Sequence, residues 1–420
     1  MSPANPKFVP RAGDYRGQLW APLLVAGAFL APGHLFEWAL EYLWLAAQLT
    51  ALFVFLILNR TALQPIAGVA PMIWLYVFLA ITISGIISAI YGYVALSIPP
   101  ELADAFDLLR FAISIPLVIF IGNMITPVNL HKILFVIKIV ILFNIICSIC
   151  LIYDISPISD ILIIVYEDAK IQFDDNYIRT GIPFANPNFA AYIFVLLLSL
   201  FLFFEKSVVF SALLLLAIFF TGSRSGYLAT LPLMVLAYLQ IMLSSLKSFK
   251  YACLFVFTNV AVLIFAYSTE VLFSSFNRVT ELIDAYIGGD VSEVTSAAVR
   301  LNVISDATAY IASSPFLGVG PGRSLGFDVV DSQLVAWPLN FGIPAAIVLY
   351  MIFSAPPWQL AIKASSPGQK SAALVTALSF FIMLATGDFL KNFRLLYLTL
   401  AIFQCLHISA FNASSLNRKA

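Results

Sequence analysis

The sequence predicts a polytopic, all-α membrane protein with about 12 transmembrane helices and one large helical loop outside the membrane. Hydrophobic residues occupy 61% of the 420 positions, charged residues occupy only 10%, and the mean hydropathy is +0.98. A soluble globular protein of this size could not cover its surface with so few polar side chains. Apolar runs near the roughly 20 residues that cross a bilayer as a helix recur along the whole chain.

Taken in order, the apolar runs divide into twelve expected spans. The six spans of the first half are 19–35, 39–58, 69–96, 108–125, 133–153 and 189–204. The six spans of the second half are 208–220, 227–243, 251–267, 334–353, 372–386 and 395–411. The first two spans are nearly fused, and a count of eleven would move the C-terminus to the other face of the membrane.

The distribution of charge supports this division. Cytoplasmic tails are expected at 1–18 and 412–420, membrane helices at 19–153, 189–267 and 333–411, and extracytoplasmic loops at 154–188 and 268–332. With this topology the cytoplasmic segments are short and basic, and their only acidic residues are Asp14 and Glu205. Most acids fall on the opposite face, as the positive-inside rule expects.

Basic residues also differ in type between the two faces. Lysine dominates the cytoplasmic segments, whereas the outer face holds mostly arginines, namely Arg110, Arg179, Arg224, Arg278, Arg300, Arg323 and Arg394. A planar guanidinium binds phosphate or carboxylate oxygens in pairs and stays charged in a low-dielectric site. The pattern indicates a bound phosphate or carboxylate on the outer face. The alternative is that these arginines pair with the many acids there.

The turn Thr221-Gly222-Ser223-Arg224-Ser225-Gly226 places an arginine between two apolar spans. One interpretation is a snorkelling side chain that caps a helical hairpin; the other is an anion site of hydroxyls, glycine N–H groups and the guanidinium. The preceding apolar run of about 14 residues would be about 21 Å long as a helix, so the turn would lie below the outer surface. Because the turn contains no carboxylate, we favour the anion site.

The second outer loop, 268–332, is expected to contain a helix. Asp290 and Glu293 form a capping box that opens it, apolar residues follow at helical spacing, and Ser314-Pro315 ends it. Arg300 lies on this expected helix. Its side chain is expected to point either toward a cavity or toward water.

Two further motifs lie at the ends of the outer loops. Loop 154–188 closes with Arg179 and then Asn186-Pro187-Asn188. Loop 268–332 contains a glycine run, Gly318–Gly322, directly before Arg323. The glycine run either forms a nest of backbone N–H groups for an anion or is simply a turn.

These motifs together resemble the O-antigen polymerase and ligase superfamily of bacterial envelope proteins. The resemblance is carried by Asn186-Pro187-Asn188 opening a span, the Thr221–Gly226 turn, Arg300 followed by Pro315-Phe316-Leu317-Gly318-Val319-Gly320, and Asp331-Ser332 leading to Asn340-Phe341-Gly342-Ile343. It covers roughly 179–350, whereas the first five spans match only in being apolar.

The resemblance implies a GT-C-like glycosyltransferase in the bacterial inner membrane, with its active site facing the periplasm. Its substrates would be oligosaccharides linked to undecaprenyl diphosphate, held by arginines without a metal or another cofactor. Carried over by position, Arg224 and Arg300 are catalytic candidates that also bind the diphosphate, with Arg179 as a third. Arg323, beside the glycine run, is a further diphosphate-binding candidate.

An acceptor hydroxyl needs a carboxylate as general base, and Asp331 is the first candidate. Asp328, Asp306 and Asp388 stand behind it, and the alternative for Asp331 is a loop acid that pairs with Arg323. Ligases of the superfamily usually have a histidine where this chain has Asp331, so the sequence favours a polymerase.

Two other functions remain open from the sequence. One is ligase-type transfer of a finished glycan to lipid A core or another acceptor, and the other is a membrane transporter or flippase. Expected partners are the lipid-linked oligosaccharide and membrane lipid, with a chain-length regulator and a flippase as further candidates and no nucleic acid.

Overall fold

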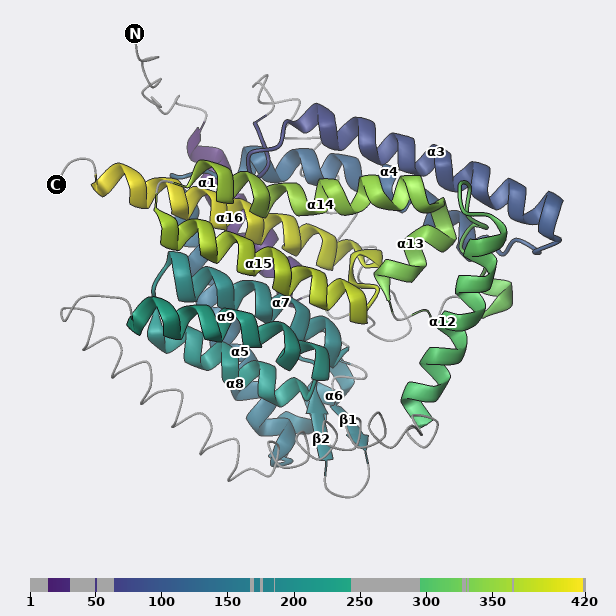
Figure 1. Ribbon diagram of the computed structural model, residues 1–420. Coiled ribbons are helices and arrows are strands. Elements are labelled where there is room, and N and C mark those ends of the chain that lie inside the picture. The colour runs from purple at the N-terminus through teal and green to yellow at the C-terminus, as the bar shows by residue number, and fades with distance from the viewer. Residues whose placement is uncertain are drawn as a thin grey trace, which may run out of the picture.

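The computed structural model describes residues 14–30, 50, 64–166, 170–173, 177–184, 186–242, 295–326, 330, 332–364 and 366–417. Within these ranges the chain forms a bundle of helices with one two-stranded hairpin (Figure 1). Seven of the described helices are long and apolar enough to cross a membrane, and two shorter apolar helices accompany them. The predicted helical, polytopic architecture is therefore confirmed.

The first half of the bundle contains α1 (Asp14–Leu30), α3 (Pro71–Leu96), α4 (Leu102–Met124), α5 (Leu130–Ile152) and the short α6 (Ile158–Val165). Strands β1 (Lys170–Phe173) and β2 (Tyr177–Thr180) precede α7 (Pro187–Ser199), the π-helical turn η1 (Leu200–Phe204), α8 (Val208–Thr221) and α9 (Arg224–Met242). The second half contains α12 (Thr295–Ser313), η4 (Arg323–Leu325), α13 (Gln333–Phe341), α14 (Ile343–Lys363), α15 (Pro367–Thr386), η6 (Phe389–Lys391) and α16 (Phe393–Asn417).

Helices α7 and α16 form the centre of the bundle. Almost every described side chain of both is buried, because α7 packs against α8, α9, α15 and α16, and α16 also contacts α1, α4 and α14. The Tyr192 hydroxyl of α7 lies 2.7 Å from Oγ1 of Thr399 on α16. Ser199 of α7 likewise forms a hydroxyl hydrogen bond with Thr376 of α15. These two hydroxyl pairs satisfy polar groups of the core across neighbouring helices.

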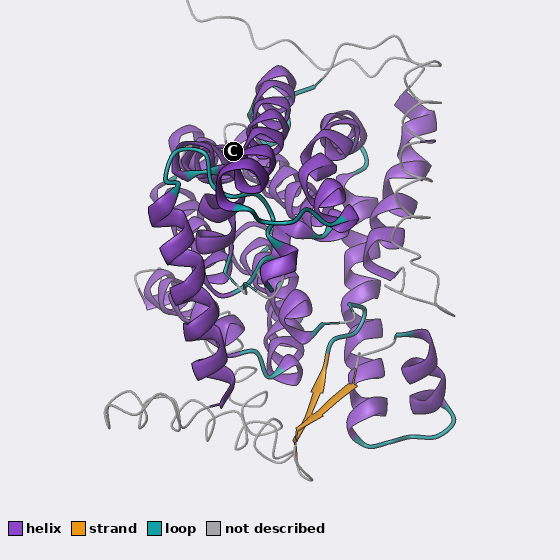
Figure 2. Ribbon diagram, turned by 90° about the vertical axis from the view of Figure 1, so that its right-hand side faces the viewer, coloured by secondary structure: helices purple, strands orange, loops and turns teal. Residues whose placement is uncertain are grey.

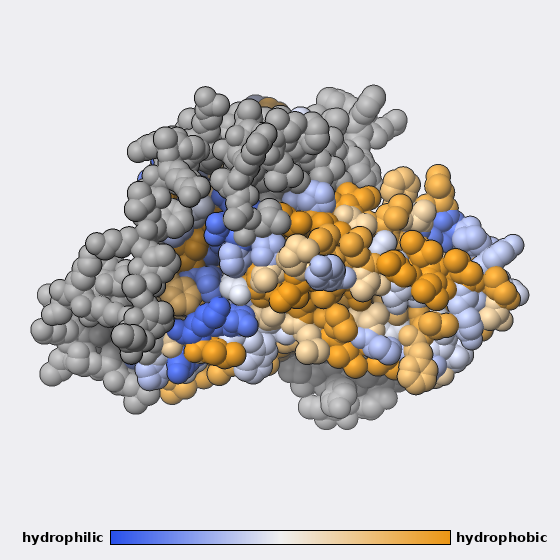
Figure 3. Space-filling model, turned by 90° about the horizontal axis from the view of Figure 1, so that it is seen from above, coloured by the Kyte–Doolittle hydropathy of each residue, from blue (hydrophilic) through white to orange (hydrophobic). Residues whose placement is uncertain are grey.

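The outer surface of the bundle is apolar. Large hydrophobic side chains are exposed along α3 and α14, including Met72, Ile83, Ile90 and Val94 on α3, and Ile347, Met351, Trp358 and Ile362 on α14. Figure 3 shows a broad hydrophobic surface on the face of the bundle that α3 and α14 occupy in Figure 1. Such a surface is unstable in water and suits contact with lipid.

One predicted span is wrong. This span was expected as one run over 334–353, but α13 ends at Phe341, the chain turns at Gly342 with φ 83°, and the spanning helix α14 begins at Ile343. Gly342 ends one helix and a proline follows at the start of the next, a common helix–helix boundary. The candidate span is therefore Ile343–Lys363.

The other expected spans fare differently. The expected span 372–386 is longer than predicted and covers Pro367–Thr386. Apart from Thr50, spans 39–58 and 251–267 lie outside the described residues, so the total of twelve stays a prediction.

Several connections gather at one end of the bundle, on the right in Figure 1. These are the α3–α4 and α8–α9 turns, the β1–β2 hairpin and the helix α12, and we call this end the hairpin end. Figure 2 views it directly and shows the two strands beside the helices. The strands pair antiparallel, with Ile171 opposite Arg179. This strand pair was not predicted, whereas α12, which carries Arg300 and ends at Ser313, was.

The glycine run after α12 is wedged between helices. Gly318 and Gly320 have φ values of 72° and 84°, and a side chain on Gly320 would approach Ala89 Cα of α3 to 2.9 Å. The backbone N–H of Val319 donates to the Leu339 carbonyl of α13 at 2.7 Å. Close backbone packing therefore accounts for these glycines, as the turn interpretation expects.

We expect Gly92→Ala to destabilise the fold by about 1–3 kcal/mol, because Gly92 of α3 lies directly against the wedged segment. A methyl group there would collide with the backbone carbonyl of Val319. Thermal unfolding in detergent would measure the loss. Gly368→Ala is the matched control, since its nearest neighbour would be Gln240 Nε2 at 3.6 Å. Equal unfolding temperatures for the two variants would contradict the wedge.

Candidate active site

Arg179 joins three segments at the hairpin end. From β2, its Nε donates to the Thr221 carbonyl at 2.8 Å and its Nη2 donates to Asn188 Oδ1 at 2.9 Å. Thr221 ends α8, and Asn188 lies in the first turn of α7. Asn186 caps the same turn, because its Oδ1 accepts the backbone N–H of Asn188 at 2.8 Å. The arginine and the Asn-Pro-Asn motif of the sequence therefore form one structure.

The α8–α9 turn presents Arg224 at the first residue of a helix. Helix α8 has 14 residues, as predicted, and is followed by Gly222, whose φ is 55°. Ser223 is buried, and its Oγ accepts the backbone N–H of Gly226 at 3.3 Å, which is an N-cap contact. Arg224 itself is half-buried. The N-terminus of α9 and the guanidinium thus bring positive charge to one place.

A carboxylate lies close to the same region. Asp388 precedes η6, whose first residue, Phe389, stacks on Tyr192 of α7 with ring centroids 4.6 Å apart. Phe389 also contacts Phe189 at 5.9 Å, and Phe189 is the residue after Asn188, which holds Arg179. The first turn of α7 therefore contacts both Phe389, the neighbour of Asp388, and the Arg179 side chain.

Asp388 is held by a buried glutamine. Gln333, only 1% exposed, donates from Nε2 to Asp388 Oδ1 at 2.7 Å, and its Oε1 accepts the backbone N–H of Leu390 at 3.1 Å. The Tyr350 hydroxyl donates to the Gln333 carbonyl at 3.1 Å. These bonds fix the amide, and the amide in turn fixes one oxygen of the carboxylate.

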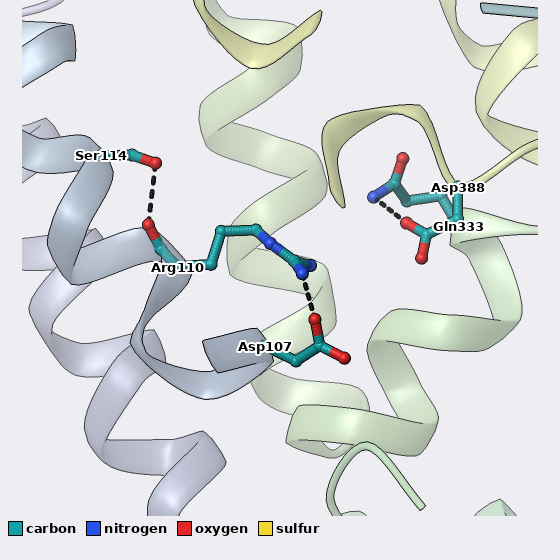
Figure 4. Close-up of polar contacts among 5 residues, drawn as sticks. All are labelled: Asp107, Arg110, Ser114, Gln333 and Asp388. Carbon is teal, nitrogen blue, oxygen red and sulfur yellow. Dashed lines mark hydrogen bonds and ion pairs between the residues drawn. The ribbon is translucent and has the colours of Figure 1, made fainter. Parts of the chain in front are cut away.

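An ion pair on α4 faces this carboxylate. Arg110 pairs with Asp107, three residues before it, and Figure 4 shows the Arg110 side chain extending toward Gln333 and Asp388. Asp107 and Gln333 were not among the predicted site residues. For Asp107, the spacing to Arg110 on an apolar helix was the available signal.

Arg394 has a structural role. It is 3% exposed, and it donates from Nε to the Ala28 carbonyl at 3.0 Å and from Nη2 to the Phe29 carbonyl at 3.2 Å. The Tyr166 hydroxyl adds a bond to the Leu30 carbonyl at 2.9 Å. Burial raises the pKa of Tyr166 to about 12, so it remains a neutral donor. Together these side chains satisfy the carbonyls at the end of α1.

The predicted site residues are thus only partly brought together. Arg179 contacts the turn that carries Arg224. Arg300 lies on α12, and Arg323 is the first residue of η4. The hydroxyl of Ser324, also in η4, donates to the Pro99 carbonyl of the α3–α4 connection at 2.8 Å. Asp331 lies outside the described residues, as does Asp328, and Asp306 is exposed on α12. Among the described residues, no group of His, Cys, Asp and Glu side chains could hold a metal ion.

Residues 209–350 match the family described as O-antigen ligase. The match confirms the resemblance to the O-antigen polymerase and ligase superfamily. It contains the turn with Arg224, helix α12 with Arg300, the wedged glycine run and the α13–α14 boundary. No curated protein and no solved structure matches the chain. Arg179 lies before the matched range and Asp388 lies after it.

We expect Arg394→Gln to lower the free energy of unfolding by about 1–3 kcal/mol, because buried carbonyls of α1 would lose a charged donor. Thermal unfolding of the purified protein would measure the change. Lys370→Gln is the matched control, since Lys370 is exposed in the first turn of α15. An R394Q protein as stable as K370Q would rule out this role.

Proposed function

We propose that the protein is a polysaccharide polymerase of O-antigen or exopolysaccharide synthesis. It transfers a growing glycan from undecaprenyl diphosphate to a lipid-linked repeat unit, in a bacterial inner membrane and with the hairpin end facing the periplasm. The O-antigen ligase match supports a glycosyltransferase-like enzyme, and the apolar helices support a multi-pass membrane protein. A GT-C-like fold and a metal-independent reaction are parts of this proposal.

The observation that carries the proposal is the bond from Arg179 to the Thr221 carbonyl. It links the strand that carries Arg179 to the turn that carries Arg224, 45 positions later in the sequence, and so supports a shared role for the two arginines. The N-terminus of α9 adds its partial positive charge beside Arg224. Such an arrangement suits a diphosphate better than a neutral ligand, since the guanidinium fork matches pairs of phosphate oxygens.

In the proposed reaction, the bond between the sugar C1 and the diphosphate oxygen breaks, and the electron pair leaves with the diphosphate. Negative charge therefore grows on the leaving group, and fixed cations stabilise the transition state more than the ground state. Arg224 and Arg300 act on this charge, and Arg323 contributes to diphosphate binding. Arg179 holds the turn in place and adds its charge to the same region.

The second candidate is a ligase that transfers finished glycan to lipid A core or another acceptor. It is favoured by the description of the matched family, which is O-antigen ligase. The polymerase is preferred because Asp331 stands where ligases of the superfamily usually have a histidine.

Deletion of the gene distinguishes the two candidates. For a polymerase, the ladder of lipid-linked glycans collapses to single repeat units. For a ligase, long glycans accumulate on the lipid and are missing from their acceptor. Gel analysis of extracted lipid-linked glycans, with a complemented strain as control, measures this. An unchanged ladder together with unchanged glycan attachment would reject both candidates.

We expect Arg224→Lys to lower transfer activity by about tenfold or more, because lysine keeps the charge but lacks the paired N–H donors. The rate of glycan transfer in membranes with equal protein content measures the effect. Lys370→Arg is the matched control, since it exchanges the same two cations on the exposed start of α15. Wild-type chain lengths with R224K would refute the diphosphate role of Arg224.

A further inference from the structure

We propose that Asp107, Arg110, Gln333 and Asp388 form the subsite for the acceptor sugar, with Asp388 as the base that takes the proton of the attacking hydroxyl. The inference rests on the proposed function and deepens it. The arginines at the α8–α9 turn bind the diphosphate of the donor, and these four residues bind the other substrate.

Helix α4 packs against both α13 and α16, the elements next to Gln333 and Asp388. Phe111, the residue after Arg110, contacts Phe341 of α13 with ring centroids 5.7 Å apart, and α4 also packs along α16. Gln333 begins α13, and Asp388 lies just before η6 and α16. Figure 4 shows both pairs directed into the space between these elements.

The fold alone does not account for the Asp107–Arg110 ion pair on α4. Asp107 is 4% exposed, and the ion pair lies within the apolar candidate span Asp104–Met124, where charges are costly. Arg110 Nε is buried and has no hydrogen-bond partner in the part of the chain that the structure describes. Apolar side chains in place of such a pair often stabilise a protein. Polar groups retained at that cost, with unused hydrogen-bonding capacity, indicate a ligand.

The mixture of donors and acceptors selects a sugar. A phosphate oxygen only accepts hydrogen bonds, whereas each sugar hydroxyl both donates and accepts. The guanidinium of Arg110 donates, and the carboxylates of Asp107 and Asp388 accept. Moreover, Asp107 neutralises the charge of Arg110 that an anionic ligand would need. The arginines near α9 therefore suit a diphosphate, whereas this subsite suits the hydroxyl groups of a sugar.

Asp388 is placed for proton transfer. The Gln333 amide donates to Asp388 Oδ1 at 2.7 Å. The next residue, Phe389, contacts Phe189 in the turn of α7 whose Asn188 accepts from Arg179. In the step proposed, the acceptor O–H proton moves to Asp388 while the hydroxyl oxygen forms a bond to C1. The bond from C1 to the diphosphate oxygen breaks, and the diphosphate keeps the electron pair. Asp388 then releases the proton to water.

Asp388→Asn tests the base. Asparagine has the same shape and still offers Gln333 an oxygen, so the fold and the hydrogen bond are retained. We expect kcat to fall about 100-fold or more. Binding of undecaprenyl diphosphate alone is expected to stay within about twofold of wild type, because the diphosphate is bound elsewhere. The assay uses purified full-length protein and, as acceptor, the lipid-linked repeat unit that accumulates in the deletion strain.

Two further variants make this result specific. Asp160→Asn is the matched control, because Asp160 is exposed on α6 and bonds only locally, to Ser156 at 2.8 Å. Asp331→Asn compares the other candidate base. Wild-type turnover in D388N, or loss of undecaprenyl diphosphate binding in D388N, would overturn the proposal. If D331N alone loses turnover, the subsite is wrong while the polymerase function stands.

The ion pair is tested by a double variant, Asp107→Leu with Arg110→Met, which removes both charges and leaves none unpaired. We expect the KM for the acceptor repeat unit to rise about tenfold or more, with unchanged binding of undecaprenyl diphosphate. A wild-type acceptor KM would overturn the role of the pair. If even the wild-type protein transfers no glycan, the proposed function itself fails.

Discussion

The two hydrogen bonds of Arg179 hold the candidate site together. One end of this side chain belongs to a two-stranded hairpin that has little core of its own, and the other reaches the end of α8 and the start of α7. The next residue, Thr180, adds a hydroxyl contact of 2.9 Å to Ser148 of α5. Charged donors form stronger hydrogen bonds than neutral ones. The position of the α8–α9 turn, and with it Arg224, therefore depends on Arg179, a residue of the β1–β2 hairpin.

The arginines of the outer loops divide by what they contact. Arg394 satisfies backbone carbonyls, Arg110 pairs with an acid, and Arg179 connects segments. The interpretation that outer arginines pair with outer acids thus holds for Arg110. Residue type alone could not separate these roles, because a guanidinium serves a helix end, a carboxylate and a phosphate with the same donors.

Much of the fold was predictable because hydrophobic runs report directly on helices that cross a membrane. The break at Gly342 was missed, although a glycine that ends a helix and a proline that begins the next were available as signals. The strands were missed because four-residue strands in a polar loop give almost no periodic signal. The bond between Gln333 and Asp388 joins positions 55 apart, and only tertiary packing brings them together.

The wedged glycine run also helps to hold helix α12 in place. Backbone hydrogen bonds fix the segment that leads into the glycine run, from the Gly318 N–H to the Ser314 carbonyl and from the Ile343 N–H to the Pro315 carbonyl. The second half of α12 also packs through Ala307 against Val319, Ala336 and Leu339. The C-terminal half of α12 is therefore fixed against α13 and the wedged segment, and the position of the helix that carries Arg300 depends on this contact.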